Sequence, residues 1–268
     1  MPEGDTIYRA AQRLHRVLIG RTIQSVEGSD IIPLAGSLLG SVVKDIESRG
    51  KHLLIHFSHS QVLHSHLGMS GSWQIYRKGE NWRKPKWQAA LMLVTADHCV
   101  VCFQPKCIEL VSDLELRRNA WLQHLGPDLL GESTPPEVIV ARFRTQNGVS
   151  IGEALLNQTV VSGIGNVYKS EVLFLEQLDP QVHVSALTDE QIASLVSTAT
   201  RLLRRNLTAE KRRTRFRATG PAVWVYGRNG EPCLKCGSTV RMVRQGNMAR
   251  STYYCPGCQG IQQAATRP

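Results

Sequence analysis

Apolar residues along residues 4–18 recur at the spacing of a single helical face. These positions are Ile7, Ala10, Ala11, Leu14, Val17 and Leu18. The spacing predicts one amphipathic helix. From residue 21 to about residue 116 the pattern changes to short apolar runs, separated by clusters of Gly, Ser, Asn and Lys. The clearest runs cover residues 53–57, 91–94 and 100–103. Repeated short strands with turn signals predict a β-sandwich or a β-barrel.

Loop-forming residues concentrate in residues 125–136, where Gly, Pro, Asp and Ser dominate. We therefore place the main domain boundary there. Beyond it the chain becomes helical. Thr188 and Gln191 have the spacing of a capping box, and one apolar face continues through residues 192–203. A cysteine-rich tail follows. We expect domains at residues 1–124, 135–222 and 223–260, with a linker at 125–134 and a tail at 261–268.

Positive charge is concentrated near the C-terminus. The 268 residues contain 32 Lys and Arg against 22 Asp and Glu, a net charge of +10. Residues 201–268 alone carry +12, which leaves the first 200 residues at −2. This distribution favours a polyanionic partner, nucleic acid first. An apolar content of 42% with 20% charged residues excludes a mainly disordered chain.

The sequence also indicates a compartment. No apolar run approaches the roughly 18–20 residues needed to span a bilayer, and the N-terminus lacks the layout of a secretory signal. We expect a cytoplasmic protein without a membrane partner, associated with the nucleoid if the source is bacterial. Seven cysteines, an odd number, then favour thiols or metal ligands over a disulfide framework.

Two C-x-x-C pairs predict a metal site. Cys233 with Cys236 and Cys255 with Cys258 are separated by 18 residues, inside the window of a four-thiolate zinc site. The intervening residues suffice for a strand, a turn and a returning strand, so zinc would close a small hairpin with little core of its own. With four thiolates and no open position, this one ion would be structural rather than catalytic.

Other cysteines and histidines fit packing better than metal binding. Cys99 and Cys102 lie three apart in a strand-like run, so their side chains point to opposite faces. His64 and His66 lie two apart and could share a face. With no carboxylate or Cys motif near them in the sequence, we interpret them as packing or hydrogen-bonding residues rather than metal ligands.

The second residue offers a candidate nucleophile. Removal of Met1 would leave Pro2 with a free secondary amine, and an α-amine titrates close to neutral pH. Such an amine attacks an aldehydic sugar carbon to give an iminium, an electron sink for elimination. Glu3 beside it could move protons. The local alternative is an ordinary proline near a helix start, where its missing N–H is tolerated.

Five segments resemble the formamidopyrimidine-DNA glycosylase/endonuclease VIII family of DNA base-excision repair enzymes, in the family's order. They are residues 1–7 (MPEGDTI), 49–53 (RGKHL), 66–71 (HLGMSG), 157–168 (NQTVVSGIGNVY) and 250–258 (RSTYYCPGC). The resemblance implies an α+β, two-domain fold. An N-terminal β-sandwich with flanking helices would be followed by a helix-two-turn-helix domain carrying a zinc β-hairpin.

The resemblance also assigns roles. Pro2 would be the Schiff-base nucleophile at C1′, with Glu3 as the proton donor that helps to open the sugar and expel the base. Lys51 would donate a proton in β-elimination, and Arg250 in δ-elimination. A target nucleotide must leave the duplex, so its flanking phosphates need to be held; Asn166 and Arg250 would hold them.

Three further residues would contact DNA. Gly163 and Gly165 would let the chain approach a phosphate with exposed amides at the start of the next helix. Met69 resembles the residue that fills the void left by the extruded base, with a core methionine as the alternative. Residues 103–108 (FQPKCI) depart from the formamidopyrimidine branch, and with the GDT opening and NVYKSE this favours the endonuclease VIII-like branch and oxidised pyrimidines.

These observations predict a bifunctional glycosylase/AP lyase that acts as a monomer on double-stranded damaged DNA and cuts by β,δ-elimination. The alternative is a non-catalytic reader of damaged or abasic DNA with the same fold. Retention of Pro2, Glu3, Lys51 and Arg250 together favours the enzyme. A third hypothesis, a zinc-finger regulator, would need a groove-reading helix, for which no motif is present. Residues 211–217 (KRRTRFR) are either a phosphate-contacting loop or a solvated surface.

Overall fold

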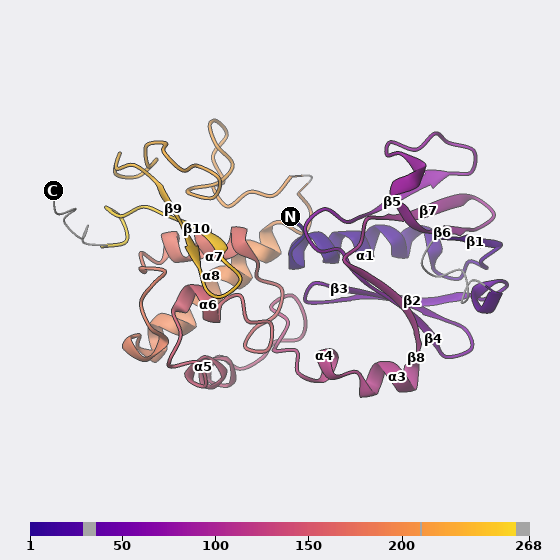
Figure 1. Ribbon diagram of the computed structural model, residues 1–268, viewed down its shortest axis with the longest axis horizontal. Helices are drawn as coiled ribbons and strands as arrows, with labels where there is room; N and C mark the ends of the chain where they lie inside the picture. Colours follow the sequence, from indigo (N-terminus) through magenta and orange to yellow (C-terminus); the bar gives the residue numbers. More distant parts are fainter. Residues whose placement is uncertain (29–35, 210, 261–268) are drawn as a thin grey trace. The chain divides into compact units, whose positions relative to one another are not determined.

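The computed structural model describes residues 1–28, 36–209 and 211–260. The expected tail at residues 261–268 lies outside them. The chain divides into two compact units, Met1–His124 and Leu125–Pro268. Each unit has its own hydrophobic core, so each is described separately below (Figure 1).

Unit 1 begins with the predicted amphipathic helix, α1 (Gly4–Leu18). Two four-stranded antiparallel sheets follow, with strand orders β1-β6-β7-β5 and β2-β3-β4-β8. The strands of the first sheet are β1 (Ser25–Glu27), β5 (Ser72–Arg77), β6 (Ala89–Val94) and β7 (His98–Phe103). Those of the second are β2 (Val43–Arg49), β3 (His52–Phe57), β4 (Gln61–His66) and β8 (Cys107–Ser112). The predicted strand runs at 53–57, 91–94 and 100–103 are therefore confirmed.

The main core of unit 1 joins α1 to both sheets. The helix packs against β2 and β3 (Figure 1), and its apolar face, including Ile7 and Leu14, is buried with Leu53 and Ile55 of β3 and Leu91 of β6. Because strand side chains alternate between faces, the neighbours of these core residues point to the outer surfaces. Cys99 and Cys102 illustrate this: one belongs to an outer cluster and the other to the core.

The outer face of the second sheet is covered by two short helices, α3 (Asp113–Arg118) and α4 (Ala120–Gln123). Leu54 and Val62 of the sheet are buried with Leu116 of α3, and Trp121 of α4 packs against them. A short 3-10 helix, η1 (Lys86–Gln88), precedes β6. This covered outer face carries the histidines discussed below.

Unit 2 is mainly helical. Its helices are α5 (Pro136–Arg144), α6 (Ile151–Ala154), α7 (Asn166–Leu175), the 3-10 helix η2 (Val184–Ala186) and α8 (Asp189–Arg205). The predicted capping box is present, because the Thr188 hydroxyl oxygen accepts a hydrogen bond from the Gln191 amide and the Gln191 side-chain oxygen accepts one from the Thr188 amide. Near the end of the described residues lies an antiparallel hairpin, β9 (Arg241–Gln245) and β10 (Arg250–Tyr254). β10 packs against α7.

Within the described residues, none of the helices has the length and apolar character required to cross a membrane.

Candidate active site and zinc centre

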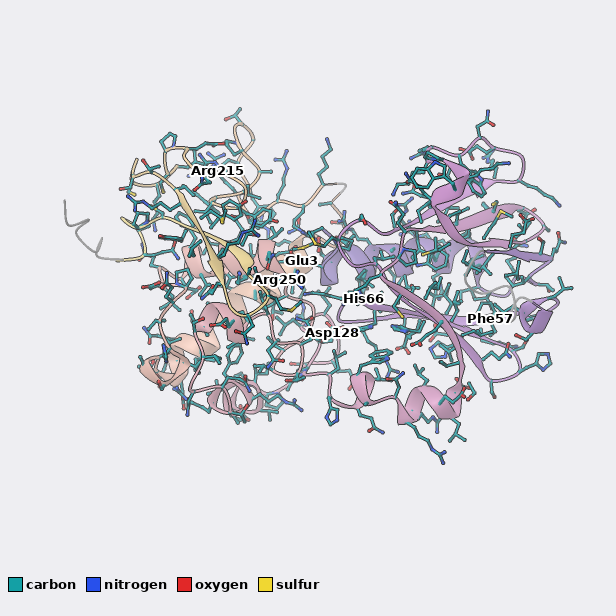
Figure 2. The ribbon with its side chains drawn as sticks, in the orientation of Figure 1. Glu3, Phe57, His66, Asp128, Arg215 and Arg250 are labelled. Carbon is teal, nitrogen blue, oxygen red and sulfur yellow. The ribbon has the colours of Figure 1, made fainter. Side chains whose placement is uncertain are left out.

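The N-terminal segment places Pro2 and Glu3 directly before α1. Glu3 is the N-cap residue, and its backbone carbonyl accepts hydrogen bonds from the amides of Thr6 at 2.8 Å and Ile7 at 3.1 Å. Glu3 is completely buried, whereas Pro2 is partly exposed. Figure 2 labels Glu3 at this helix start. A buried carboxyl group next to a partly exposed Pro2 can transfer protons locally.

Lys51 occupies the two-residue turn between β2 and β3. Arg49 pairs with His52 across the hairpin, so Gly50 and Lys51 form the turn. Gly50 has φ +59°, a left-handed conformation that glycine adopts without penalty. The turn is therefore defined by local sequence, and it presents a partly exposed lysine at the end of the sheet.

A histidine network lies directly behind this turn. His52 Nδ1 is 2.8 Å from His64 Nε2, and His64 Nδ1 is 2.8 Å from Glu109 Oε1. His64 is therefore a buried hydrogen-bonding residue, as expected, although its carboxylate partner lies far away in the sequence. Antiparallel pairing of β4 with β8 brings Glu109 opposite His64, and a partner 45 residues away cannot be seen in a single strand's pattern. The alternation of C-x-E in β8 against H-x-H in β4 was the available signal.

Burial and neighbouring cations keep these imidazoles neutral. Burial, with the adjacent histidines and Lys51 and Lys106, lowers the pKa of His52 to about 3. Burial and then the two lysines lower the pKa of His66 to about 4. Because the imidazoles of His52 and His66 are neutral, they add no positive charge near the ammonium group of Lys51.

Met69 lies in the loop between β4 and β5 with 69% of its surface exposed. It is therefore not a core methionine. The preceding Gly68 has φ +62°, and a Cβ placed there would stand 2.8 Å from the Lys106 Cβ. Only glycine fits this position without displacing a neighbour. The loop thus holds an exposed apolar side chain on a tightly defined backbone.

The loop before α7 is held by one amide side chain. Gln158 accepts a hydrogen bond from the Gly163 amide at 3.1 Å and donates to the Ile164 carbonyl at 3.1 Å. Gly163 has φ +98°, whereas Gly165, the N-cap of α7, is extended at φ −127°. Asn166 opens the helix and is largely buried. Helix N-termini of this kind bind anions through backbone amides and the helix dipole.

Arg250 is the first residue of β10 and pairs with Gln245 of β9. The turn between the strands contains Gly246 at φ +69° and Ala249 at φ +47°. Arg250 is partly exposed, and its guanidinium lies 3.8 Å from the Met248 sulfur. Figure 2 labels Arg250 on the hairpin. The hairpin accordingly presents a cation at the start of its second strand.

The four predicted zinc ligands meet in unit 2. The sulfurs of Cys233 and Cys258 are 3.8 Å apart, those of Cys236 and Cys255 are 3.4 Å apart, and all four lie within 4.8 Å of one another. Four converging thiols fit a tetrahedral zinc ion and leave no open position. The hydrogen bond from Ser238 lowers the pKa of Cys236 to about 6, which favours the thiolate that zinc requires.

The basic segment at residues 211–217 is partly built into unit 2. The Thr214 hydroxyl donates to buried Glu171, and Arg213 is held through its backbone by Asn206. Arg212 lies over the Tyr168 ring at 5.0 Å, and Arg215 over Trp224 at 5.6 Å. These contacts give the segment a defined backbone, which a freely solvated basic run would lack.

Family profiles match three parts of the chain. The formamidopyrimidine-DNA glycosylase N-terminal domain matches residues 1–107, the formamidopyrimidine-DNA glycosylase H2TH domain matches residues 125–218, and the zinc finger found in FPG and IleRS matches residues 230–260. The last match covers all four cysteines and supports one structural zinc ion, as expected.

Similar proteins match nearly the whole length of the chain. The chain is 40% identical to a "Probable endonuclease 8 2" of Streptomyces coelicolor, over 97% of this chain and 94% of that protein. It is 36% identical to the "DNA-(apurinic or apyrimidinic site) lyase Nei2" of Mycolicibacterium smegmatis, over 97% and 99%. A structure of Lactococcus lactis Fpg with DNA containing N7-benzyl-Fapy-dG matches with TM-score 0.83 and 25% identity, over 96% and 99%.

The fold and the site therefore define a DNA glycosylase and AP lyase of base-excision repair. The chain belongs to the formamidopyrimidine-DNA glycosylase/endonuclease 8 family, and the expected β-sandwich, H2TH domain and zinc hairpin are confirmed.

Proposed function

We propose that the reaction is carried by the amine of Pro2 after removal of Met1. The amine attacks C1′ of the damaged nucleotide, the C1′–base bond breaks, and the base leaves with a proton. The C1′–O4′ bond then breaks as O4′ takes a proton and the amine loses one, which leaves a positively charged iminium that joins Pro2 to the opened sugar. The observation that carries this proposal is the position of Glu3, fully buried beside partly exposed Pro2 at the start of α1. Glu3 would supply the proton that opens the sugar and expels the base.

Strand cleavage would follow by two eliminations. In the first, a proton leaves C2′ and the 3′ C–O bond breaks, with Lys51 as the proton donor. In the second, a proton leaves C4′ and the 5′ C–O bond breaks with departure of the 5′ phosphate, with Arg250 in the same role. Support comes from the placement of two partly exposed side chains, that of Lys51 within the β2–β3 turn and that of Arg250 directly after the β9–β10 turn. Side chains at such positions can reach a DNA backbone, and the hairpin fixes where they stand.

The substrate would be double-stranded DNA with one nucleotide extruded. Asn166 and Arg250 would hold the flanking phosphates, with the amides of the Gly163–Gly165 loop contributing at the helix start. Met69 would enter the vacated stack, which its exposure permits. We place oxidised pyrimidines first among the lesions, because several similar proteins carry the name endonuclease 8 and residues 103–108 differ from the formamidopyrimidine branch.

The remaining expectations fit this proposal. Residues 1–124 would form the catalytic part, residues 135–222 the helical DNA-binding part and residues 223–260 the zinc hairpin, with 125–134 as linker. One extruded nucleotide needs one enzyme, so a cytoplasmic monomer suffices.

Borohydride trapping tests the proposed nucleophile. An oligonucleotide duplex with a single abasic site is incubated with the protein and reduced, and peptide mass spectrometry locates the adduct. We expect a covalent complex whose adduct lies on Pro2. Protein that retains Met1 provides the matched control and should not be trapped. Tight abasic-site binding without trapping would instead favour the non-catalytic reader, and normal cutting by Met1-bearing protein would contradict the amine mechanism.

A further inference from the structure

Four chemically reactive side chains face one another on the outer face of the sheet β2-β3-β4-β8. The register of β4 and β8 pairs His64 with Glu109 and His66 with Cys107. Because alternate residues of a strand share a face, all four point to the same side. The ligand atoms of His64, Cys107 and Glu109 lie within 4.8 Å of one another. None of these three belongs to the four-cysteine centre.

The imidazole of His64 is oriented by a second layer of contacts. Its Nδ1 points to Glu109 Oε1 at 2.8 Å, and its Nε2 lies 2.8 Å from His52 Nδ1. The Trp121 ring stacks on both imidazoles, with centroid distances of 4.3 Å to His64 and 4.1 Å to His52. A ligating histidine characteristically donates its other N–H to a fixed acceptor. With Nδ1 on a metal, Nε2–H would donate to His52, as the observed distance allows.

The three ligand atoms and their access to solvent suit a zinc ion. An imidazole nitrogen, a thiolate sulfur and a carboxylate oxygen are the three ligand types that zinc accepts together, whereas magnesium and calcium prefer oxygen alone. A thiolate and a carboxylate neutralise a divalent charge, which matters beside Lys51 and Lys106. His64 is 2% exposed, but Cys107 is exposed and Glu109 is partly exposed, so an ion can enter from solvent.

We propose that His64, Cys107 and Glu109 bind a second zinc ion, distinct from the four-cysteine centre, with His52 as the residue that positions His64. Three protein ligands leave the fourth position open to water, the arrangement of accessible zinc sites rather than closed structural ones. The ion would join β4 to β8 at the end of the sheet where the loop carrying Met69 begins. The proposal concerns metal binding and does not depend on the role of Pro2.

Zinc stoichiometry tests it directly. The full-length protein is loaded with zinc, freed of excess ion by gel filtration, and analysed for metal and protein content. We expect two zinc ions per chain in the wild type. Cys107→Ser and Glu109→Gln should each retain one, and Cys236→Ser should lose the other. Cys99→Ala is the matched control because this cysteine lies on a different sheet, and it should keep two.

Affinity measurements distinguish a role of His52 in positioning His64 from a general effect of the substitutions on folding. Circular dichroism first confirms that each variant is folded, and Glu109→Gln removes a ligand at a partly exposed position where folding is least at risk. His52→Asn should weaken binding of the second zinc by about 10–100-fold while leaving the four-cysteine ion in place. Cobalt substitution should show a thiolate charge-transfer contribution that Cys107→Ser removes. One zinc per wild-type chain, or two in both Cys107→Ser and Glu109→Gln, would overturn the proposal.

Discussion

The carboxylate of Glu171 accepts a hydrogen bond at 2.8 Å from the amide of Val225, 54 residues further along the chain. Two neighbouring amides, those of Trp224 and Tyr226, donate to the same carboxylate at 2.7 and 2.8 Å, and the Thr214 hydroxyl donates as well. Glu171 is completely buried on α7. One helix therefore fixes the segment that leads into the zinc hairpin.

Removing this carboxylate should destabilise unit 2. Glu171→Ala leaves one buried amide, two partly buried amides and a hydroxyl without their acceptor, and each unsatisfied buried group costs about 1–3 kcal/mol. We expect a loss of at least about 3 kcal/mol in the free energy of unfolding, measured by urea denaturation. Exposed Glu132→Ala should change it by less than about 0.5 kcal/mol. Equal effects of the two substitutions would show that the network contributes nothing beyond the loss of a charge.

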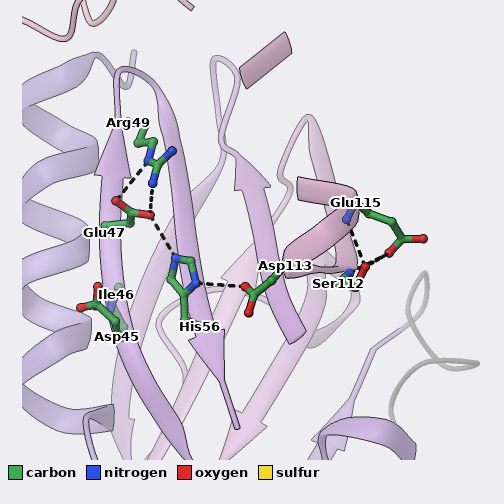
Figure 3. A network of polar contacts seen from close by, with 8 residues as sticks. All are labelled: Asp45, Ile46, Glu47, Arg49, His56, Ser112, Asp113 and Glu115. Atoms are coloured by element: carbon green, nitrogen blue, oxygen red, sulfur yellow. Dashed lines mark hydrogen bonds and ion pairs between the residues drawn. The ribbon is translucent and has the colours of Figure 1, made fainter. Parts of the chain in front are cut away.

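A pH-dependent ion pair links β2 to β3 (Figure 3). His56 Nε2 lies 3.0 Å from Glu47 Oε1, and Arg49 binds the same carboxylate at 2.9 Å. Burial acts to raise the pKa of Glu47, but hydrogen bonds from His56 and Arg49 outweigh it and the pKa falls below 4.5. The hydrogen bond to Glu47 raises the pKa of His56 above 6.5 despite burial.

The two shifts define a window of stabilisation. A raised His56 pKa contributes stability that is fully present below pH 6.5 and is lost as pH rises through the folded value. A lowered Glu47 pKa contributes stability present above pH 4.5 and lost as pH falls through its folded value. A double-mutant cycle with Glu47→Gln and His56→Gln, followed by urea denaturation, should therefore give a larger coupling energy near pH 5.5 than near pH 8.5. His15→Gln, on an exposed face of α1, is the control. A coupling energy constant across this range would contradict the assignment.

Local patterns predicted much of the fold. The apolar spacing of residues 4–18 and the capping box at Thr188 depend on neighbours within one or two turns, and both elements formed as expected. The zinc centre was also predictable, because each C-x-x-C pair defines its own turn and 18 residues allow only a short hairpin. The resemblance to a known family then supplied the order of the domains and the roles of the site residues, which no local pattern contains.

Contacts between distant strands and loops were not predictable. His64 and Glu109 meet only because β4 pairs with β8, and the register of that pairing follows from the packed sheet. No local sequence pattern marks Glu171 as buried, yet it is completely buried and its partners Thr214 and Val225 lie 43 and 54 residues further along the chain. Buried polar groups whose partners lie far along the chain leave no periodic signal.

Loss of the four-cysteine zinc should weaken DNA binding while leaving unit 1 folded. The hairpin buries few apolar side chains of its own, among them Val240 and Cys255, so the metal supplies much of its folding energy. We expect Cys236→Ser to lose affinity for an abasic-site duplex while the two sheets stay folded. Fluorescence anisotropy reports the affinity, and limited proteolysis reports which unit opens. Retention of full affinity without metal would contradict a structural role.

Met69 should matter for base extrusion and little for stability. Its side chain is 69% exposed, so Met69→Ala should change the free energy of unfolding by less than about 0.5 kcal/mol. Excision of a paired lesion should slow, because no wedge fills the empty stack, whereas cleavage of a single-stranded abasic site should be unaffected. Leu114→Ala, with 57% exposure in α3, is the matched control. Equal slowing on both substrates would assign Met69 to another step.

Arg250 should control the end left on the cut strand. As the proposed proton donor of the second elimination, its removal should stop the reaction after the first, because a general acid contributes about 100-fold or more. Arg250→Ala should therefore still cut an abasic site but leave an unsaturated aldehyde at the 3′ end in place of a phosphate. Gel mobility of the two products distinguishes them. Arg241→Ala removes an exposed arginine from the other strand of the same hairpin, and it should leave the product ratio unchanged. The same shift in both variants would show that the hairpin's total charge, rather than Arg250 itself, sets the outcome.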